Sequence, residues 1–170
     1  QSGALNESIS DVFGVLVRQF SLTQTADQAD WLIGADLLTD KVQGAALRSM
    51  ANPGSAYDDP LLGKDPQPGH MHDFIETRDD NGGVHLNSGI PNRAFYLAAT
   101  AMGGYAWEKA GRIWYDTLCD RRLANDADFA AFAGLTIDNT AIRFGAGSGE
   151  VQAVEQAWAD VGVIPNEEAP

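Results

Sequence analysis

The first twenty residues carry their apolar side chains with the period of an α-helix. At about 100° per residue these side chains fall within one arc, as on a helix that packs against a core. They are Leu5, Ile9, Val12, Phe13, Leu16 and Phe20. Glu7 and Asp11 lie one turn apart on the opposite face, with Gly3 and Gly14 beside them, so another backbone could approach closely there. Two exposed acids on a solvated helix face are the alternative interpretation.

Four later segments have the same periodicity and carry capping residues at their ends. The sequence predicts helices that run from Ser88 to Gly103, from about Ala106 to Leu123, from Asp126 or Asp128 through Ile142, and from Ser148 to Gly162. Residues 23 to 86 are instead dense in Gly, Pro, Asp and Asn, and so long a connection is expected to be a functional loop. The expected fold is therefore all-α, an orthogonal bundle of about five helices with a long irregular loop region after the first helix.

The composition suits one compact domain and argues against two kinds of partner. A length of 170 residues with 44% hydrophobic content is enough for a sizeable core. A formal net charge of −13 leaves no basic stripe for nucleic acid, and an acidic membrane surface would repel the chain. The single cysteine, Cys119, excludes an internal disulfide and is expected to be a small buried side chain.

Three motifs follow one another along the chain. They are Gly-Ala-Leu-Asn-Glu-Ser-Ile-Ser-Asp at residues 3 to 11, Leu-Arg-Ser-Met at 47 to 50, and Asp-Asn-Gly-Gly-Val-His-Leu-Asn-Ser-Gly at 80 to 89. Together they resemble the C-terminal half of the bacterial thermolysin-like zinc metallopeptidases, and the resemblance extends from Gln1 to Val163. The stretches at residues 63 to 73 and 91 to 96 look closer to the protealysin-like branch of that family. The resemblance implies an endopeptidase with a peptide or protein substrate.

Catalysis in that family requires a helix with the motif His-Glu-x-x-His, which binds zinc and supplies a general base. The three histidines of this chain are His70, His72 and His85, and no two of them lie four residues apart. The sequence also lacks a starting Met and a signal peptide, and it opens inside a motif. We therefore expect residues 1 to 170 to be an excised C-terminal domain whose partner is the missing N-terminal catalytic domain. Alone, it is expected to bind zinc poorly and to be inactive.

The resemblance assigns four residues to the chemistry. Glu7 is implied as the third zinc ligand, and Asp11 as the acceptor that orients a zinc-binding histidine from the absent domain. His85 is implied as the hydrogen-bond donor to the oxyanion of the transition state, with Asp80 holding its ring through the other nitrogen. A structural histidine in a tight turn is the alternative for His85.

The resemblance also implies a substrate site. Arg48 would bind a substrate carbonyl through its planar guanidinium, although the residue alone could pass as a surface arginine. Leu47, Ile33 and Leu37 would line the pocket for the side chain that follows the scissile bond, which implies a hydrophobic preference there. His70 and His72 have no third ligand at an evident spacing, so they are not expected to bind a metal.

One departure from the family concerns calcium. Members with a double calcium site have several carboxylates just after the first helix, where this chain has Arg18, Leu32 and Ala35 and retains only Asp30. Because a calcium ion needs six or more oxygen ligands, we expect this site to be lost.

Two other functions remain open at this stage. The chain could be a noncatalytic helical module that binds peptides or a protein partner. A hydrolase that uses Glu7 and Asp11 as a carboxylate pair is weaker, because acids on one helix turn cannot flank opposite faces of a substrate. The family implies secretion by analogy, whereas the protealysin-like branch leaves an intracellular location open.

Overall fold

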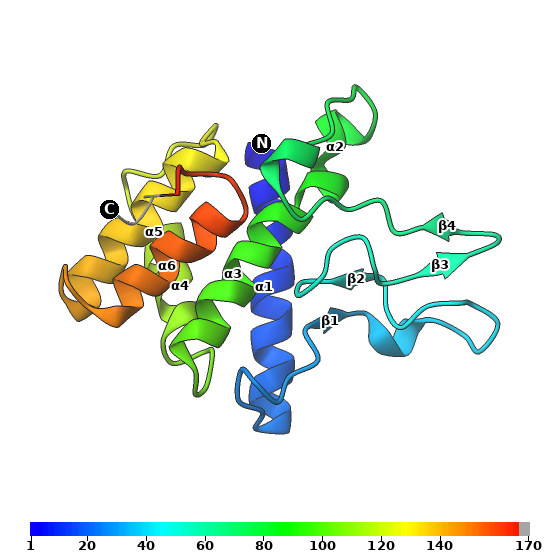
Figure 1. Cartoon of the computed structure of the whole chain (residues 1–170), viewed down its shortest axis with the longest axis horizontal. Coiled ribbons are helices and arrows are strands. Elements are labelled where there is room, and N and C mark those ends of the chain that lie inside the picture. The colour runs from blue at the N-terminus through cyan, green and yellow to red at the C-terminus, as the bar shows by residue number, and fades with distance from the viewer. Residues whose placement is uncertain (167–170) are drawn as a thin grey trace.

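A computed structural model describes residues 1–166 and is dominated by helices (Figure 1). The helices are α1 (Ser2–Leu22), α2 (Asp80–Asn87), α3 (Gly89–Met102), α4 (Ala110–Leu118), α5 (Phe129–Phe144) and α6 (Gly149–Asp160). Five of them correspond to the predicted helices, and α2 is a short addition before α3. The predicted all-α class is confirmed. No helix in the described part of the chain is both long and apolar enough to cross a bilayer.

The core lies where α3 packs between α1 and α6, with α4 and α5 closing the other side (Figure 1). Trp114 of α4 and Trp158 of α6 stack with their ring centroids 6.1 Å apart, and Phe132 of α5 meets Trp158 edge-on. All three side chains are fully buried. Offset and edge-on aromatic pairs of this kind fill a core densely.

The apolar stripe of α1 is confirmed at Leu5, Val12 and Leu16, which are buried. Its end was predicted wrongly, because Phe20 is largely exposed and only leans on Trp107 of the α3–α4 connection. The alternative of two solvated acids does not hold for Asp11, of which only 7% is exposed. The long loop region crosses this face of α1, so the helix is covered on two sides.

The close approach of another segment that was expected beside the glycines of α1 occurs at one of them. A Cβ atom built on Gly3 would lie 2.5 Å from Cγ1 of Val84, so α2 does pack tightly at this point. A Cβ atom on Gly14 would meet nothing within 4 Å, and no close approach occurs there.

The ends of the later helices are partly as predicted. Asp128 and Ser148 cap α5 and α6 by accepting hydrogen bonds from the backbone N–H groups of Ala131 and Val151. Ser88 does not cap α3, because its own backbone is helical and its hydroxyl donates to the carbonyl of His85 instead.

Cys119, which follows α4, and Ile142 of α5 lie outside the core, and for Cys119 this corrects the prediction. Helix α4 is shorter than expected and ends at Leu118, which leaves Cys119 exposed in the following turn. Ile142 of α5 is exposed as well.

The region between α1 and α2 is irregular, as predicted, but contains two small antiparallel sheets. β1 (Leu32–Ile33) pairs with β2 (Arg48–Ser49), and β3 (Asp58–Asp59) pairs with β4 (Gly63–Lys64). The β3–β4 hairpin extends away from the helices (Figure 1). Two short 3₁₀ turns, η1 (Ala35–Leu37) and η2 (Met71–Asp73), complete the region.

Buried carboxylates bind backbone N–H groups in this region that have no partner strand. Asp59 accepts hydrogen bonds from the backbone N–H groups of Gln43, Leu61 and Leu62 at 2.8 to 3.0 Å. Asp65 likewise accepts from three backbone N–H groups, those of Gly54, Ala56 and Gln67. Because buried backbone donors need partners, these two side chains fix loops that lack a ladder of their own.

Candidate active site

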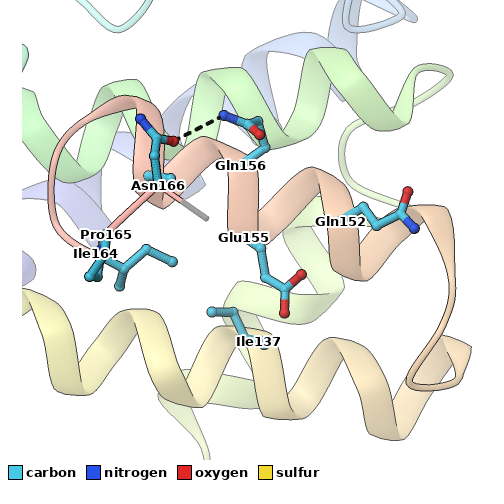
Figure 2. A pocket seen from close by; sticks show the side chains of 8 residues that line it. Ile137, Gln152, Glu155, Gln156, Ile164, Pro165 and Asn166 are labelled. Carbon is cyan, nitrogen blue, oxygen red and sulfur yellow. Dashed lines mark hydrogen bonds between the residues drawn. The ribbon is translucent and has the colours of Figure 1, made fainter. Parts of the chain in front are cut away.

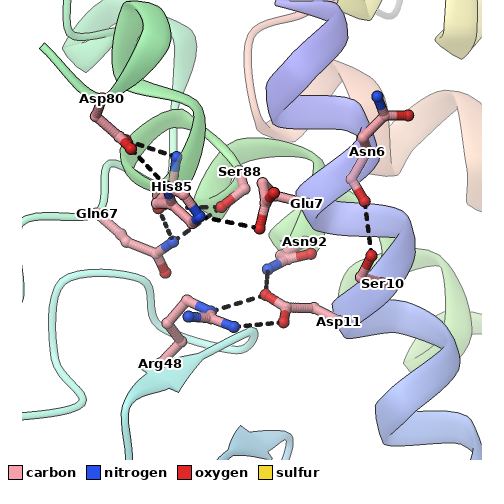
Figure 3. A network of polar contacts seen from close by, with 10 residues as sticks. All are labelled: Asn6, Glu7, Ser10, Asp11, Arg48, Gln67, Asp80, His85, Ser88 and Asn92. Atoms are coloured by element: carbon pink, nitrogen blue, oxygen red, sulfur yellow. Dashed lines mark hydrogen bonds and ion pairs between the residues drawn. The ribbon is translucent and has the colours of Figure 1, made fainter.

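The predicted polar site residues come together beside α1 (Figure 3). Glu7 and Asp11 project from α1, His85 from α2, and Arg48 from β2. The long irregular region thus returns the second and third motifs to the helix that carries the first.

The imidazole of His85 lies directly against Glu7. Its Nε2 atom is 3.3 Å from Oε2 of Glu7, and the two side chains are 57% and 38% exposed. Both groups therefore face an open side of the molecule, where a ligand or another polypeptide can reach them.

Asp80 holds the other edge of the imidazole. Its Oδ1 atom lies 2.5 Å from Nδ1 of His85, and its Oδ2 atom accepts the backbone N–H of the same residue at 2.8 Å. The hydrogen bond to Asp80, with a smaller contribution from the charge of Glu7, raises the pKa of His85 above its ordinary value. The bond in turn lowers the pKa of Asp80. With Nδ1 committed to Asp80, Nε2 is the nitrogen that faces the open side.

A left-handed turn makes this double contact possible. Asp80, Asn81, Gly82 and Gly83 all have positive φ, with values of 53°, 51°, 89° and 73°. Asp, Asn and Gly are the residues that tolerate this conformation best. The Asp-Asn-Gly-Gly motif therefore has a conformational reason, because the turn brings the Asp80 carboxylate back over His85.

Arg48 and Asp11 form a two-pronged ion pair below His85 (Figure 3). Nε and Nη2 of Arg48 donate to the two carboxylate oxygens at 2.8 and 2.6 Å. Asn92 of α3 donates to the same carboxylate at 2.9 Å. The pair fixes the plane of both groups, while Nη1 of Arg48 makes no hydrogen bond within residues 1–166.

The three predicted apolar residues are not gathered in one pocket. Leu37 and Leu47 both pack around Gly34, where a Cβ atom would lie 3.2 and 2.9 Å from their Cδ1 atoms. Leu37 is 71% exposed. Ile33 instead lines a separate cavity of about 240 Å³ with Ser10, Asp11, Gly14, Val15, Arg18 and Leu32.

At the expected calcium position, Arg18 pairs with the one retained acid. Nη1 of Arg18 lies 2.5 Å from Oδ1 of Asp30, which also accepts the backbone N–H of Leu32. A guanidinium group thus supplies the positive charge beside this carboxylate.

Two other features lie apart from this site. The Nδ1 atoms of His70 and His72 contact each other, but residues 1–166 contain no group of three or more His, Cys, Asp or Glu side chains that could hold a metal ion. A pocket of about 510 Å³ is formed by α5, α6 and residues 164–166, and its polar lining includes Glu155 and Gln156 (Figure 2). None of the predicted site residues borders that pocket.

Sequence reasoning missed two buried amides at the site, Asn92 and Gln67. Asn92 follows Ser88 by four residues, so a polar pair on one face of α3 was a signal that could have been noticed. Gln67 stands between two prolines, which indicate a fixed loop but not what its amide contacts.

The chain is similar to several known proteins. A family model for the α-helical domain of thermolysin metallopeptidase matches residues 1–163. An extracellular metalloprotease of Pectobacterium carotovorum subsp. carotovorum is 63% identical over 168 residues, which are 99% of this chain and 48% of that protein. Protease PrtS of Photorhabdus sp. (strain Az29) is 56% identical over 170 residues, covering 99% of this chain and 45% of that one.

A solved structure is similar throughout. The precursor of protealysin, a metalloproteinase from Serratia proteamaculans, superposes with a TM-score of 0.93 at 68% identity. The match covers 95% of this chain and 50% of that one. The chain therefore spans about half the length of each of these three proteins.

Proposed function

The chain belongs to the thermolysin metallopeptidase family as its α-helical domain, and from this premise we propose that it supplies one half of the active site of a zinc-dependent endopeptidase. The observation that carries the proposal is the contact between Glu7 and Nε2 of His85, whose Nδ1 atom is bound by Asp80. Residues from distant motifs meet there on an open face.

Glu7 fits the role of a zinc ligand. A carboxylate oxygen is a ligand that zinc accepts, and a catalytic zinc has three protein ligands. Within residues 1–166 no cluster supplies three such groups, so we propose that the other two are histidines of a His-Glu-x-x-His segment in the remaining half of the protein. When bound, zinc would act as a Lewis acid and lower the pKa of a water molecule.

His85 would act on the oxygen of the scissile carbonyl. With Nδ1 donating to Asp80, the imidazolium form carries its second proton on Nε2, which faces Glu7 and the open side. A donor placed there stabilises the negative charge that develops on the carbonyl oxygen during attack. The raised pKa of His85 keeps the imidazole protonated over a wider pH range.

Arg48 and Asp11 would act as a unit. Asp11, fixed by Arg48 and Asn92, would accept the second N–H of a zinc-bound histidine and thereby hold its tautomer. Nη1 of Arg48 would donate to a substrate carbonyl after the scissile bond. Leu47 and Leu37, which pack around Gly34, would favour an apolar substrate side chain at that position, whereas Ile33 lines a separate cavity.

Reconstitution tests this function. The chain is co-expressed with the N-terminal half of its parent protein, and hydrolysis of a peptide substrate is measured. We expect activity in the assembled protein, none in the isolated chain and none with Glu7→Gln. We expect His85→Ala to lower kcat by on the order of 10² to 10³.

Matched substitutions at exposed sites serve as controls. Glu108→Gln and His72→Ala remove the same groups outside the site and should leave activity unchanged. Full activity of Glu7→Gln, or no hydrolysis by a correctly assembled wild-type protein, would contradict the proposal and favour a noncatalytic binding module.

Export is a separate proposal. The relative from Pectobacterium carotovorum is named an extracellular metalloprotease, and another from Staphylococcus epidermidis an extracellular elastase. We propose that the parent of this chain is secreted in the same way.

A further inference from the structure

Helix α2 has little of its own to hold it in place. It is eight residues long, it begins with a left-handed turn, and only Gly83 and Asn87 are buried. A helix this short is not stable without tertiary contacts. Yet it carries His85, whose position relative to Glu7 decides what the site can do. Its anchor must therefore come from neighbouring segments.

Gln67 provides such an anchor from the loop between β4 and η2 (Figure 3). Its side-chain Nε2 donates to the backbone carbonyl of His85 at 2.7 Å and to the hydroxyl of Ser88 at 3.0 Å. The Ser88 hydroxyl donates to the same carbonyl at 3.1 Å. Both hydrogens of the amide are thus used, and the carbonyl of His85 accepts from two donors.

Gln67 is itself rigidly placed. Only 6% of it is exposed, and it is flanked by Pro66 and Pro68. Its backbone N–H donates to Asp65, the buried carboxylate that also binds two other backbone N–H groups of this loop. Because the loop backbone has little conformational freedom, a side chain on it can fix the position of another segment.

The Asn-Ser-Gly motif after His85 serves the same attachment. Asn87 exchanges hydrogen bonds in both directions with the backbone of Ile75, at 2.9 and 3.0 Å. A Cβ atom on Gly89 would lie 2.5 Å from the carbonyl oxygen of Pro68, so only glycine lets the Gln67 loop pass this closely. The three residues of the motif thus bind two loops to the end of α2.

We propose that Gln67 is a positioning residue for the peptidase reaction, which holds the main chain of His85 so that its ring stays between Asp80 and Glu7. The inference rests on the proposed function of His85. The donor bonds of the Gln67 amide to the His85 carbonyl and the Ser88 hydroxyl are the feature that ties this side chain to the position of His85.

The decisive experiment is a double-mutant cycle in the assembled, full-length protein. Gln67→Met keeps the length of the side chain and removes the donor. We expect kcat for peptide hydrolysis to fall by on the order of 10- to 100-fold with KM little changed. In a His85→Ala background the same substitution should have no further effect on kcat, because its influence acts through His85. An equal loss in both backgrounds, or no loss in either, would overturn the proposal.

Gln19 offers a matched control. It is also a buried glutamine, but neither polar atom of its side chain has a partner within residues 1–166. Gln19→Met should therefore leave kcat unchanged. Ser88→Ala, which removes the second donor to the His85 carbonyl, is the alternative variant if Gln67→Met does not fold, and it should lower kcat in the same His85-dependent way.

The two proposals can fail separately. An inactive wild-type assembly would contradict the function assigned to the chain. An active wild type whose kcat is indifferent to Gln67→Met and Ser88→Ala would leave that function intact and remove the positioning role alone.

Discussion

Non-glycine residues with left-handed backbone conformation lie in the turn before His85, at the end of α1 and at Trp31. Asp80 and Asn81 have positive φ because the turn before His85 requires it, and strain of this kind is often found at functional sites. Thr23 also has positive φ, at 54°, but it lies at the end of α1. Its N–H donates to the carbonyls of Gln19 and Phe20, as in a helix-terminating turn that normally contains glycine.

Thr23→Gly should accordingly stabilise the protein. Glycine removes the steric strain of a β-branched residue in this conformation. The free energy gained in the folded state exceeds the free energy lost through the larger conformational entropy of the unfolded chain. We expect a gain of about 0.5 to 1 kcal/mol in the free energy of unfolding, measured by urea denaturation. Ser21→Gly, two residues earlier where φ is helical, should destabilise instead. A loss with Thr23→Gly would contradict this interpretation.

Among the elements, the β3–β4 hairpin depends on one carboxylate. Hydrogen bonds from the backbone N–H groups of Gln43, Leu62 and Leu61 lower the pKa of Asp59. A lowered folded-state pKa means that the ionised form stabilises the fold. The stabilisation is present above the unfolded pKa of about 3.9 and is lost as the pH falls through the lower folded value.

Asp59→Asn should therefore lower the melting temperature at pH 7 and bring a smaller further loss on acidification than wild type shows. Thermal melts between pH 7 and pH 2.5 measure both effects. Asp58→Asn is the matched control, because Asp58 is exposed on the same strand and makes no side-chain hydrogen bond within residues 1–166. Identical pH profiles for Asp59→Asn and wild type would contradict the assigned role.

The junction of α2 and α3 is an element-level test of close packing. Gly89→Ala should destabilise by about 1 to 3 kcal/mol, since its Cβ atom would lie 2.5 Å from a backbone oxygen. Gly134→Ala in α5 should stabilise by about 0.5 to 1 kcal/mol, because nothing lies within 4 Å and alanine favours the helix. Chemical denaturation of the two variants should give changes of opposite sign. An equal change in the free energy of unfolding for both variants would show that the backbone at the α2–α3 junction can move to accommodate the Cβ atom.

At the scale of the whole molecule, periodicity in the sequence was sufficient for the helical bundle. Apolar residues at helical spacing must be buried together, so the five main helices could be predicted with their approximate limits. The exposed Phe20, Ile142 and Cys119 could not, because burial at the edge of a stripe depends on which neighbour covers it.

The candidate site was predictable where motifs carried it. Glu7, Asp80 and His85 were named from the sequence, and the structure brings them into contact. Their chemical roles stay predictions. The contacts of Gln67 and Asn92 could not be predicted, since an amide bonds whatever the tertiary fold places beside it. The ion pair between Arg48 and Asp11 could not be predicted for the same reason.

The stability of the whole molecule is expected not to depend on calcium. Arg18 pairs with Asp30 where the resemblance implies a calcium site, so a cation there would meet a positive group and too few oxygens. We expect the melting temperature of the chain to be the same with EGTA and with millimolar calcium. A clear fall with EGTA in wild type that is absent in Asp30→Asn would show that the site persists.

Zinc content of the assembled protein tests the central claim most directly. Wild type and Glu7→Gln, each joined to the N-terminal half of the parent, are dialysed against a graded zinc buffer and analysed for metal. Joint coordination predicts one zinc per wild-type molecule and a zinc affinity at least on the order of 10- to 100-fold weaker in Glu7→Gln. Equal zinc affinity in the two proteins would show that Glu7 is not a ligand and would contradict a metal site shared between the two halves.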